Sequence, residues 1–497
     1  MEDARAITPS RRTFLSSTVA TVATAAIGGC SYTGHGGQGG DQGGEDHGRY
    51  KPPREKQCCL HVRRRLSNWT DQDFSSYRHA VSVMQSRPVT DPTSWIFQAN
   101  MHGAPSADGP NAAWRQCQHG TPHFLTWHRM YLYWWERIVR KASGDPAFAI
   151  GYWRYDPGDA PSLALPLPFR SPTVGNPLFS SRNGAINGGA GIPGSAADSH
   201  FAMLETQLLA PPSPGFSSSL EGTPHGAVHV QVGGLMGSVP TAARDPIFWT
   251  HHTNIDRLWS RWLDNPAHAN PASGPFVTTV FQFVDEDGKP VQMSGKDVLK
   301  TVEQLCYRYD DDPMLSNAAG RTAARRPNPE RVVIESKILS ALPEPRHALG
   351  AEPSTFKLDL PPAAQETFRA AIGSEGAQRI VLEFEGASVK GTPDTTYEVY
   401  LNLPAGQRAP GINSPHFAGS LAFFGLEEDA EHANHGSVAK SISLNVTPTV
   451  AALQKGQAVN ANNLAVTVVP VQAGAEPGGP VRTRAVPSFR RIVLRSE

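Results

Sequence analysis

The sequence has no excess of charge of either sign. Of its 497 residues, 45 are Lys or Arg and 45 are Asp or Glu, so the formal net charge is zero. A neutral chain has no broad positive field to attract a nucleic-acid backbone, whereas small and nearly neutral partners suit it. The balance therefore argues against a nucleic-acid-binding protein and favours small-molecule chemistry.

Cysteine is also scarce. The five cysteines are Cys30, Cys58, Cys59, Cys117 and Cys306, an odd and sparse set that makes no disulfide framework. The adjacent Cys58 and Cys59 cannot easily bridge each other, although either can pair with Cys306 if the fold brings them close. The sequence leaves that pairing open.

The N-terminus has an apolar stretch, but not one long enough for an ordinary membrane span. Residues 16–29 are uncharged and small or apolar. They follow Ser-Arg-Arg-Thr-Phe-Leu at 10–15, which resembles a twin-arginine export motif, and lead into Ile-Gly-Gly-Cys at 27–30, which resembles a lipoprotein cleavage box. We predict that residues 1–30 are an export signal and that Cys30 is a candidate lipid-modified membrane tether. The mature protein is then periplasmic, extracellular or lipid-anchored at the cell surface.

Charged residues make up only 18% of the chain, while Gly (46) and Pro (43) are abundant, as is typical of proteins rich in loops. All ten Trp residues lie before position 263, so the two halves differ in construction. We predict a Gly-rich tether over 31–57, a helical domain over 58–313, a linker over 314–340 and a β-rich domain over 341–497.

The spacing of apolar residues supports this division. Helical spacing occurs at 71–84, 122–138, 225–230 and 252–263, and the Gly, Pro, Ser and Asn residues between 156 and 219 predict long loops. Later runs rich in Val, Ile, Leu and Thr predict strands at 354–360, 379–389, 396–403, 416–424, 441–446, 464–471 and 489–494. We expect an α + β chain, with a mainly helical domain followed by an all-β, sandwich-like domain.

Six of the 18 histidines stand out by their spacing. His225 and His229 are one helical turn apart, so their rings project from the same face. His252 follows where a new helix is expected to begin, and Asp256 lies one turn further, placed to accept a hydrogen bond from a ring nitrogen that a metal does not use. Three neutral imidazoles suit copper, zinc or iron. His251 is about 100° away from His252 around the helix, so we select His252 as the ligand.

The earlier half supplies His102, His119 and His128. Because His119 and His128 are nine residues apart, a single helix would put them on opposite faces. We therefore expect a loop ligand and a helix ligand, separated at Thr121-Pro122. His123 competes for the same site, but its spacing from His128 disfavours it.

The residues around these histidines resemble the two copper motifs of the tyrosinase and polyphenol oxidase family. One is His-Gly-Thr-Pro-His-Phe-Leu-Thr-Trp-His-Arg-Met-Tyr-Leu at 119–132, and the other is Asp-Pro-Ile-Phe-Trp-Thr-His-His-Thr-Asn-Ile-Asp-Arg at 245–257. The likeness covers residues 58–310 and extends loosely through the tail. It implies a four-helix bundle that binds two copper ions, through a first group of His102, His119 and His128 and a second group of His225, His229 and His252.

The resemblance also suggests roles for neighbouring residues. Cys117 occupies the place of a cysteine that some members join by a thioether to the histidine two positions later. Glu221 stands where plant-like members carry a carboxylate that holds a water, and Val230 and Val239 correspond loosely to pocket walls. Gly226, which follows the first histidine of the second group, replaces an asparagine often found in members with strong monophenol activity. The alternatives are an ordinary buried thiol for Cys117, a charge at a helix N-terminus for Glu221, and plain core packing for Val230 and Val239.

The expected activity is the oxidation of o-diphenols to o-quinones by dioxygen, with weaker monophenol hydroxylation because Gly226 cannot make the hydrogen bond of an asparagine. The alternatives are a full tyrosinase, a haemocyanin-like dioxygen carrier and a zinc hydrolase, the last disfavoured by two complete histidine triads. Tyr-Arg-Tyr at 307–309 resembles the motif that ends the catalytic domain of longer members. The tail after it is either an active-site lid, with Phe417, Phe423 and Phe424 as candidate plugs, or a stability or binding module.

Overall fold

The computed structural model describes residues 49–50, 60–156, 160–211, 214–313, 336–343, 345–373, 378–428, 441–456, 463–476 and 478–497. The predicted signal, most of the tether and most of the linker lie outside these ranges, so those assignments remain predictions. The chain divides into two compact units, Met1–Gly43 and Gly44–Glu497, and all of the described residues belong to the second. None of the helices described is long and apolar enough to cross a membrane.

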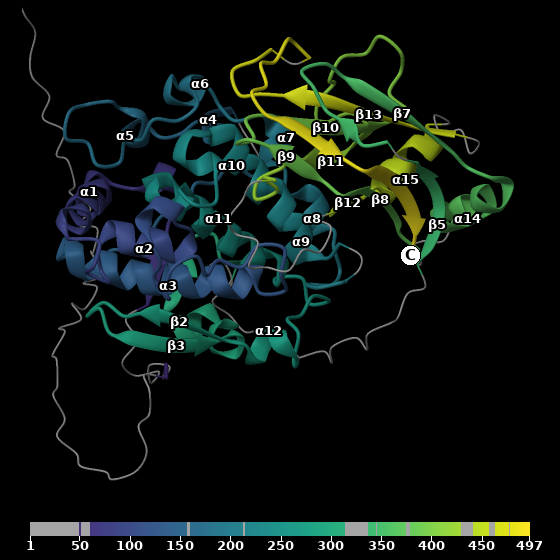
Figure 1. The fold of residues 1–497 in the computed structure, drawn as a ribbon. Helices are drawn as coiled ribbons and strands as arrows, with labels where there is room; N and C mark the ends of the chain where they lie inside the picture. The colour runs from purple at the N-terminus through teal and green to yellow at the C-terminus, as the bar shows by residue number, and fades with distance from the viewer. Residues whose placement is uncertain are drawn as a thin grey trace, which may run out of the picture. The chain divides into compact units, whose positions relative to one another are not determined.

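Five longer helices build the first part of this unit (Figure 1). They are α1 (Asp71–Ser86), α2 (Trp95–His102), α3 (Phe124–Ser143), α10 (Ala227–Val232) and α11 (Pro246–Trp262). Thr70 and Asp73 form a reciprocal capping box that starts α1, and Gly144, with a φ of 68°, ends α3. Both helices lie where the spacing of apolar residues predicts them.

Helix α11 begins six residues before the predicted start at His252. Asp245 caps it by accepting a hydrogen bond from the backbone N–H of Ile247, and Pro246 occupies its first turn. His252 therefore lies in the second turn of α11. The prediction that the helix begins at His252 is wrong, because apolar spacing alone did not register this cap.

Short elements occupy the loop-rich regions between the long helices. They are α4 (Ala160–Leu163), α5 (Leu167–Arg170), α6 (Gly184–Asn187), α7 (Gly194–Ala197), α8 (His200–Met203), α9 (Phe216–Leu220), a π-helical turn (Glu221–Gly226), α12 (Pro275–Thr278) and α13 (Thr301–Leu305). The hairpin of β2 (Val280–Val284) and β3 (Pro290–Ser294) runs alongside α3 (Figure 1). Strand β1 (His61–Arg63) pairs in parallel with β4 (Tyr307–Tyr309), which brings the beginning and the end of the helical part together.

The second part is built on three antiparallel sheets. Their strands are β5 (Lys337–Leu342), β6 (His347–Ala348), β7 (Ser354–Asp359), β8 (Ile380–Glu385), β9 (Ser388–Lys390), β10 (Thr396–Leu401), β11 (Phe417–Leu421), β12 (Ser441–Asn445), β13 (Asn463–Val471), β14 (Val486–Phe489) and β15 (Arg491–Ser496). The strand orders are β11-β10-β13-β7, β12-β8-β15-β5 and β6-β14-β9. Every predicted strand run contains a strand, and the predicted fold class is confirmed. The β-rich part also contains two helices, α14 (Pro362–Gly373) and α15 (Thr447–Lys455).

Hydrogen bonds join the β-rich part to helix α10. The side-chain amide of Gln231 donates to Thr396 Oγ1 at 2.7 Å and to the carbonyl of Val471 at 2.8 Å, and Gln231 Oε1 accepts from the backbone N–H of Ala473 at 2.7 Å. Gln231 is fully buried, and both of its amide N–H groups and its carbonyl oxygen are hydrogen-bonded across this contact. Strand β10 and the end of β13 consequently lie beside α10.

Candidate metal centre

The first histidine group comes from three separate segments. His102 is the last residue of α2, His119 lies in the loop before α3, and His128 projects from the second turn of α3. Their ring centroids are 5.1 Å (His102 to His119), 5.6 Å (His102 to His128) and 5.3 Å (His119 to His128) apart. The structure thus brings together the loop and helix residues that the sequence analysis grouped.

The second group lies between α10 and α11. His225 lies in the π-helical turn, His229 lies one turn further on α10, and His252 projects from α11. The ring centroid of His225 is 4.7 Å from that of His229 and 5.0 Å from that of His252. The Nε2 atoms of His229 and His252 are 3.3 Å apart.

The two groups adjoin each other. The rings of His128 and His252 stack at 4.6 Å with only 13° between their planes, and the rings of His119 and His225 are 5.5 Å apart. The ring nitrogens of His102, His128 and His252 all lie within 4.8 Å of one another, as a site shared between two metal positions requires.

Backbone carbonyls fix which nitrogen of each ring faces the centre. The Nδ1 atoms of His128, His225 and His229 lie 2.7 Å, 3.0 Å and 2.8 Å from the carbonyl oxygens of Phe124, Glu221 and Met236. The Nδ1 atom of His102 lies 3.3 Å from the carbonyl of Val239. A carbonyl can only accept, so Nδ1 carries the hydrogen and Nε2 keeps a lone pair. That tautomer is the one that binds a metal through Nε2.

The charge state of the rings also fits a metal. Burial lowers the pKa of His128 to about 3 and holds the pKa values of His119, His225 and His229 well below the ordinary value, and the neighbouring histidines lower the last three further. The rings are therefore neutral, as metal ligands must be. Among the described residues, the buried Nε2 atoms of His119, His128 and His225 have no hydrogen-bond partner. A soft or borderline cation held by imidazoles satisfies them.

His251 also approaches the second group, contrary to the expectation that it points away. Its ring nitrogen lies within 4.8 Å of those of His225, His229 and His252, and its ring stacks against His225 at 5.6 Å and 21°. Its Nδ1 atom is 2.9 Å from the hydroxyl of Tyr155. The reason is that the group lies between two helices, so a side chain rotated around α11 still meets the histidines of α10.

Asp256 does not support a ligand imidazole, and that prediction is wrong. Its carboxylate accepts hydrogen bonds from Arg63 at 3.2 Å, from Tyr307 at 2.6 Å, and from Arg129 and Tyr309. Burial by itself would raise the pKa of Asp256, but the two arginines outweigh burial and lower it. The carboxylate instead ties α11 to β1, α3 and β4.

Cys117 and Glu221 both lie beside the first group. The Sγ atom of Cys117 is 3.6 Å from His119 Nδ1, and burial raises the pKa of the thiol to about 12. The Oε1 atom of Glu221 accepts a hydrogen bond of 2.6 Å from the backbone N–H of Gly120. Glu221 therefore joins the turn that carries His225 to the loop that carries His119.

The walls predicted near the second group are buried. Val230 packs with Ala227 and with Ala422 from the β-rich part, and Val239 accepts from His102 through its carbonyl. A Cβ atom on Gly226 would lie 3.6 Å from the Cβ of Phe424. The segment that follows β11 thus lies directly beside Gly226.

Phe424 is the residue that the sequence analysis did not distinguish from its neighbours. Its ring stacks on His229 at 4.1 Å and 8°, and it approaches His225 at 5.7 Å and His119 at 5.9 Å. Phe423 lies in the core of the β-rich part, and Phe417 packs on Tyr400. No periodicity separates these three phenylalanines, because the distinction depends on how the β-rich part contacts α10.

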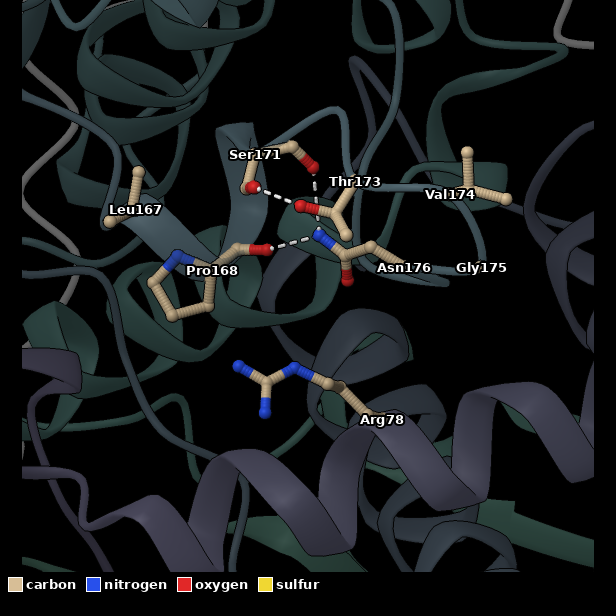
Figure 2. A pocket seen from close by; sticks show the side chains of 8 residues that line it. All are labelled: Arg78, Leu167, Pro168, Ser171, Thr173, Val174, Gly175 and Asn176. Atoms are coloured by element: carbon tan, nitrogen blue, oxygen red, sulfur yellow. Dashed lines mark hydrogen bonds between the residues drawn. The ribbon is translucent and has the colours of Figure 1, made fainter.

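Two further features lie apart from the histidine groups. His123 stands at the N-terminus of α3 with its ring against Phe281 at 5.4 Å, and it belongs to none of the potential metal-binding groups among the described residues. A surface pocket is lined by residues of α1, α5 and the following loop, with Arg78 pointing into it (Figure 2). Its lining contains no histidine, and the hydroxyls of Ser171 and Thr173 bond to each other at 2.8 Å. Among the described residues, the potential metal-binding groups consist of the histidines of this candidate centre and Cys117.

Family comparisons cover most of the described residues. Residues 92–187 and 190–265 match the common central domain of tyrosinase, residues 275–319 match the polyphenol oxidase middle domain, and residues 339–480 match a domain of unknown function. The first match contains all six histidines.

Individual relatives agree with these matches. The chain is 31% identical over 461 residues to the tyrosinase HcTyr1 of Hahella sp., an alignment that covers 83% of this chain and 95% of that one. It is 26% identical over 465 residues to the chloroplastic polyphenol oxidase A1 of Vicia faba, covering 82% and 74%. The solved structure of latent apple tyrosinase superposes with a TM-score of 0.61 at 22% identity, over 90% of this chain and 99% of that one, which shows the same fold.

Proposed function

The chain belongs to the tyrosinase family of copper-dependent phenol oxidases, and we propose that it oxidises o-diphenols to o-quinones with dioxygen at two copper ions. The observation that carries the proposal is the pair of adjoining histidine groups, in which carbonyl oxygens hold at least four rings with Nε2 toward the centre. Two copper ions bound there would activate dioxygen and accept the two electrons of the diphenol.

The protein residues supply binding, orientation and proton handling. His102, His119 and His128 hold one copper, and the second group holds the other. We assign Glu221 the role of holding a water at the edge of the site, since its carboxylate accepts from Gly120 in the loop of His119 while its backbone carbonyl accepts from His225. A phenol has a reference pKa near 10, so an incoming monophenol must lose a proton to such a water before it can be hydroxylated.

Gly226 supports diphenol oxidation as the dominant activity. It has no side chain to orient the water at Glu221, although a Cβ atom there would meet Phe424 and Ala422 at the ordinary contact distances of 3.6 Å and 3.7 Å. The diphenol reaction does not depend on this water, because a catechol supplies both electrons without being hydroxylated. We therefore expect a high ratio of diphenol to monophenol turnover.

A side-by-side assay of copper-loaded protein tests the proposal. We expect a catechol to be oxidised at once and the matching monophenol slowly, after a lag. The variant Gly226→Asn should raise the monophenol rate relative to the diphenol rate, whereas Gly226→Ala, which adds only a Cβ atom, should not. Equal rates on both substrates without a lag would instead identify a full tyrosinase, the activity in the name of the Hahella relative. Dioxygen binding without turnover of either phenol would identify a haemocyanin-like carrier.

We further propose that the β-rich part is a lid that keeps the chain latent. The ring of Phe424 covers His229 face to face, where a phenol would have to approach the second copper. Hydrogen bonds of Gln231, and that of Ser420 Oγ to the carbonyl of Ser195 at 3.1 Å, hold the lid in place. Two of the similar solved structures, of apple tyrosinase and aurone synthase, carry the word latent in their titles.

Limited proteolysis in the linker, or mild detergent, tests the lid. We expect the diphenol rate of the copper-loaded chain to rise while its copper content stays constant. An unchanged rate after complete cleavage and separation of the β-rich part would contradict the lid and identify that part as a stability module.

A further inference from the structure

A continuous row of indole and phenol rings leads away from the first histidine group. The ring of Trp127 lies against the ring of His128 at 4.9 Å and against that of Tyr131 at 4.8 Å. Tyr131 in turn contacts Trp249, of α11, at 4.8 Å. The inner end of the row therefore adjoins a candidate copper ligand.

The row continues through the helical core to its edge. Trp249 and Trp135 stack at 4.0 Å with 6° between their planes, which makes this the closest ring pair in the row. Trp135 contacts Tyr77 at 5.9 Å, and Tyr77 contacts Trp69 at 5.8 Å. Trp69 is 8% exposed whereas Tyr77 and Trp135 are fully buried, so the row ends where solvent begins.

The tryptophans of the row share a feature that most of the others lack. Buried indole N–H groups usually find an acceptor. Within the described part of the chain, the Nε1 atoms of Trp69, Trp127, Trp135 and Trp249 are buried without one. Five of the six tryptophans outside the row do donate a hydrogen bond, namely Trp95, Trp134, Trp153, Trp259 and Trp262. Packing an aromatic core does not require this difference.

The difference has a chemical consequence for one-electron oxidation. An oxidised indole becomes a cation radical, and it is trapped as a neutral radical when an acceptor removes its N–H proton. With no acceptor, the electron deficit stays free to move to the next ring. The two tyrosines keep their protons, since Tyr131 donates to the carbonyl of Gln98 and Tyr77 to that of Pro246, and burial raises both pKa values well above normal. A phenol is hard to oxidise without losing its proton, so the tyrosines bridge neighbouring tryptophans and do not carry the electron deficit themselves.

We propose that this row is an electron relay that protects the metal centre when an oxidant forms there and no phenol can reach it. The proposal rests on the copper oxidase function above. The lid with Phe424 explains why such protection is needed, because a lid that excludes phenols does not exclude small oxidants. With hydrogen peroxide as the oxidant, two electrons and two protons convert each molecule to two waters. Trp127 gives each electron to the oxidant and regains one in turn from Trp249, Trp135 and Trp69, across the intervening tyrosines. A one-electron donor in solution such as ascorbate finally reduces Trp69.

The test uses the copper-loaded full chain treated with hydrogen peroxide in the absence of phenol and reductant. The readouts are the electron paramagnetic resonance signal of a tryptophan radical and peptide mass spectrometry of tryptophans that have gained oxygen. We expect Trp69 to be the main modified tryptophan, ahead of Trp134, which is similarly exposed at 6% but lies outside the row. Copper-free protein should lose this selectivity.

Two variants complete the test. Trp69→Phe should shift oxidation inward to Trp135, Trp249 or a ligand histidine and shorten the life of the copper site, whereas the matched Trp134→Phe should leave the pattern unchanged. Modification that follows exposure alone, or identical patterns in the two variants, would overturn the relay. The distribution of oxidised tryptophans in the wild-type protein, with and without copper, tests the relay even if a variant does not fold. A catechol assay on the same preparation keeps the proposals apart, because failure there would refute the oxidase function.

Discussion

The two histidine groups differ in what surrounds them. The first is held within the helical part, where Cys117 lies beside His119. The second is in contact with the C-terminal part, because Phe424 stacks on His229 and Gln231, two residues further along α10, bonds to β10 and β13. The ring of Phe424 lies 4.1 Å from that of His229 but 5.9 Å from that of His119, so the β-rich part is closer to the second group than to the first. We therefore expect access to the second metal position to depend more strongly on the β-rich part.

Loss of one ligand should have the largest effect and should define the second group. We expect His252→Gln to reduce the copper content from two ions per chain to one and to abolish diphenol oxidation, because two imidazoles do not complete the site. The neighbouring His251→Gln should retain two ions, since it is the ring nitrogen of His252 that also lies within 4.8 Å of those of His102 and His128. Copper quantification decides this, and the reverse result would make His251 the ligand.

Removal of the Phe424 ring that stacks on His229 should have the second largest effect. Phe424→Ala should raise the diphenol rate of the intact chain roughly fivefold, because a stacked pair of about 1 kcal/mol no longer holds the lid against His229. Leu426→Ala, in the same segment but packed on the β-rich core, is the matched control and should leave the rate unchanged. Equal activation by both substitutions would mean that any disturbance of the segment opens the site.

A smaller effect is expected in the first group. Cys117→Ser should let a chelator remove one copper roughly tenfold faster, the scale on which supporting residues affect metal sites. If a thioether forms, the peptide that contains Cys117 and His119 will be lighter by two hydrogen atoms in the wild type. A variant that releases both ions at the wild-type rate would show that Cys117 only fills space.

The smallest effect concerns the contact between the two parts. Glu205 pairs with Arg379 at 2.8 Å, and burial raises the pKa of Glu205 to about 7. Because the pKa of Glu205 is higher in the folded chain than its unfolded value of 4.5, this group stabilises the fold fully below pH 4.5. The stabilisation is lost as the pH rises through about 7. The melting temperature of Glu205→Gln should therefore rise relative to that of the wild type by roughly 2 °C when the pH is raised from 5 to 8. A constant difference across that range would contradict this.

The sequence was sufficient for the parts of the site that depend on local spacing. The one-turn separation of His225 and His229, and the loop that must separate His119 from His128, both follow from helix geometry. The seven strand runs were visible because apolar and β-branched residues cluster between turn residues.

Long-range contacts were beyond the sequence. Asp256 has the spacing of a residue that supports a ligand, but Arg63 and Arg129 compete for its carboxylate, and neither is near it in the chain. His251 was excluded by its angle around α11, an argument that ignored the second helix facing it. Phe424 differs from Phe423 only in which face of the segment meets α10, which no single element determines.

The parallel pairing of β1 with β4 has a consequence for how the protein is made. Asp256 needs Arg63, from the beginning of the helical part, and Tyr307 and Tyr309, from its end. Helix α11 leaves the ribosome well before residues 307–309 do, so a ribosome paused in between would hold a chain whose second copper site still lacks its support. Copper acquisition is then expected late in synthesis or after it, and an apo-chain truncated before Tyr307 should be a good substrate for cellular proteases.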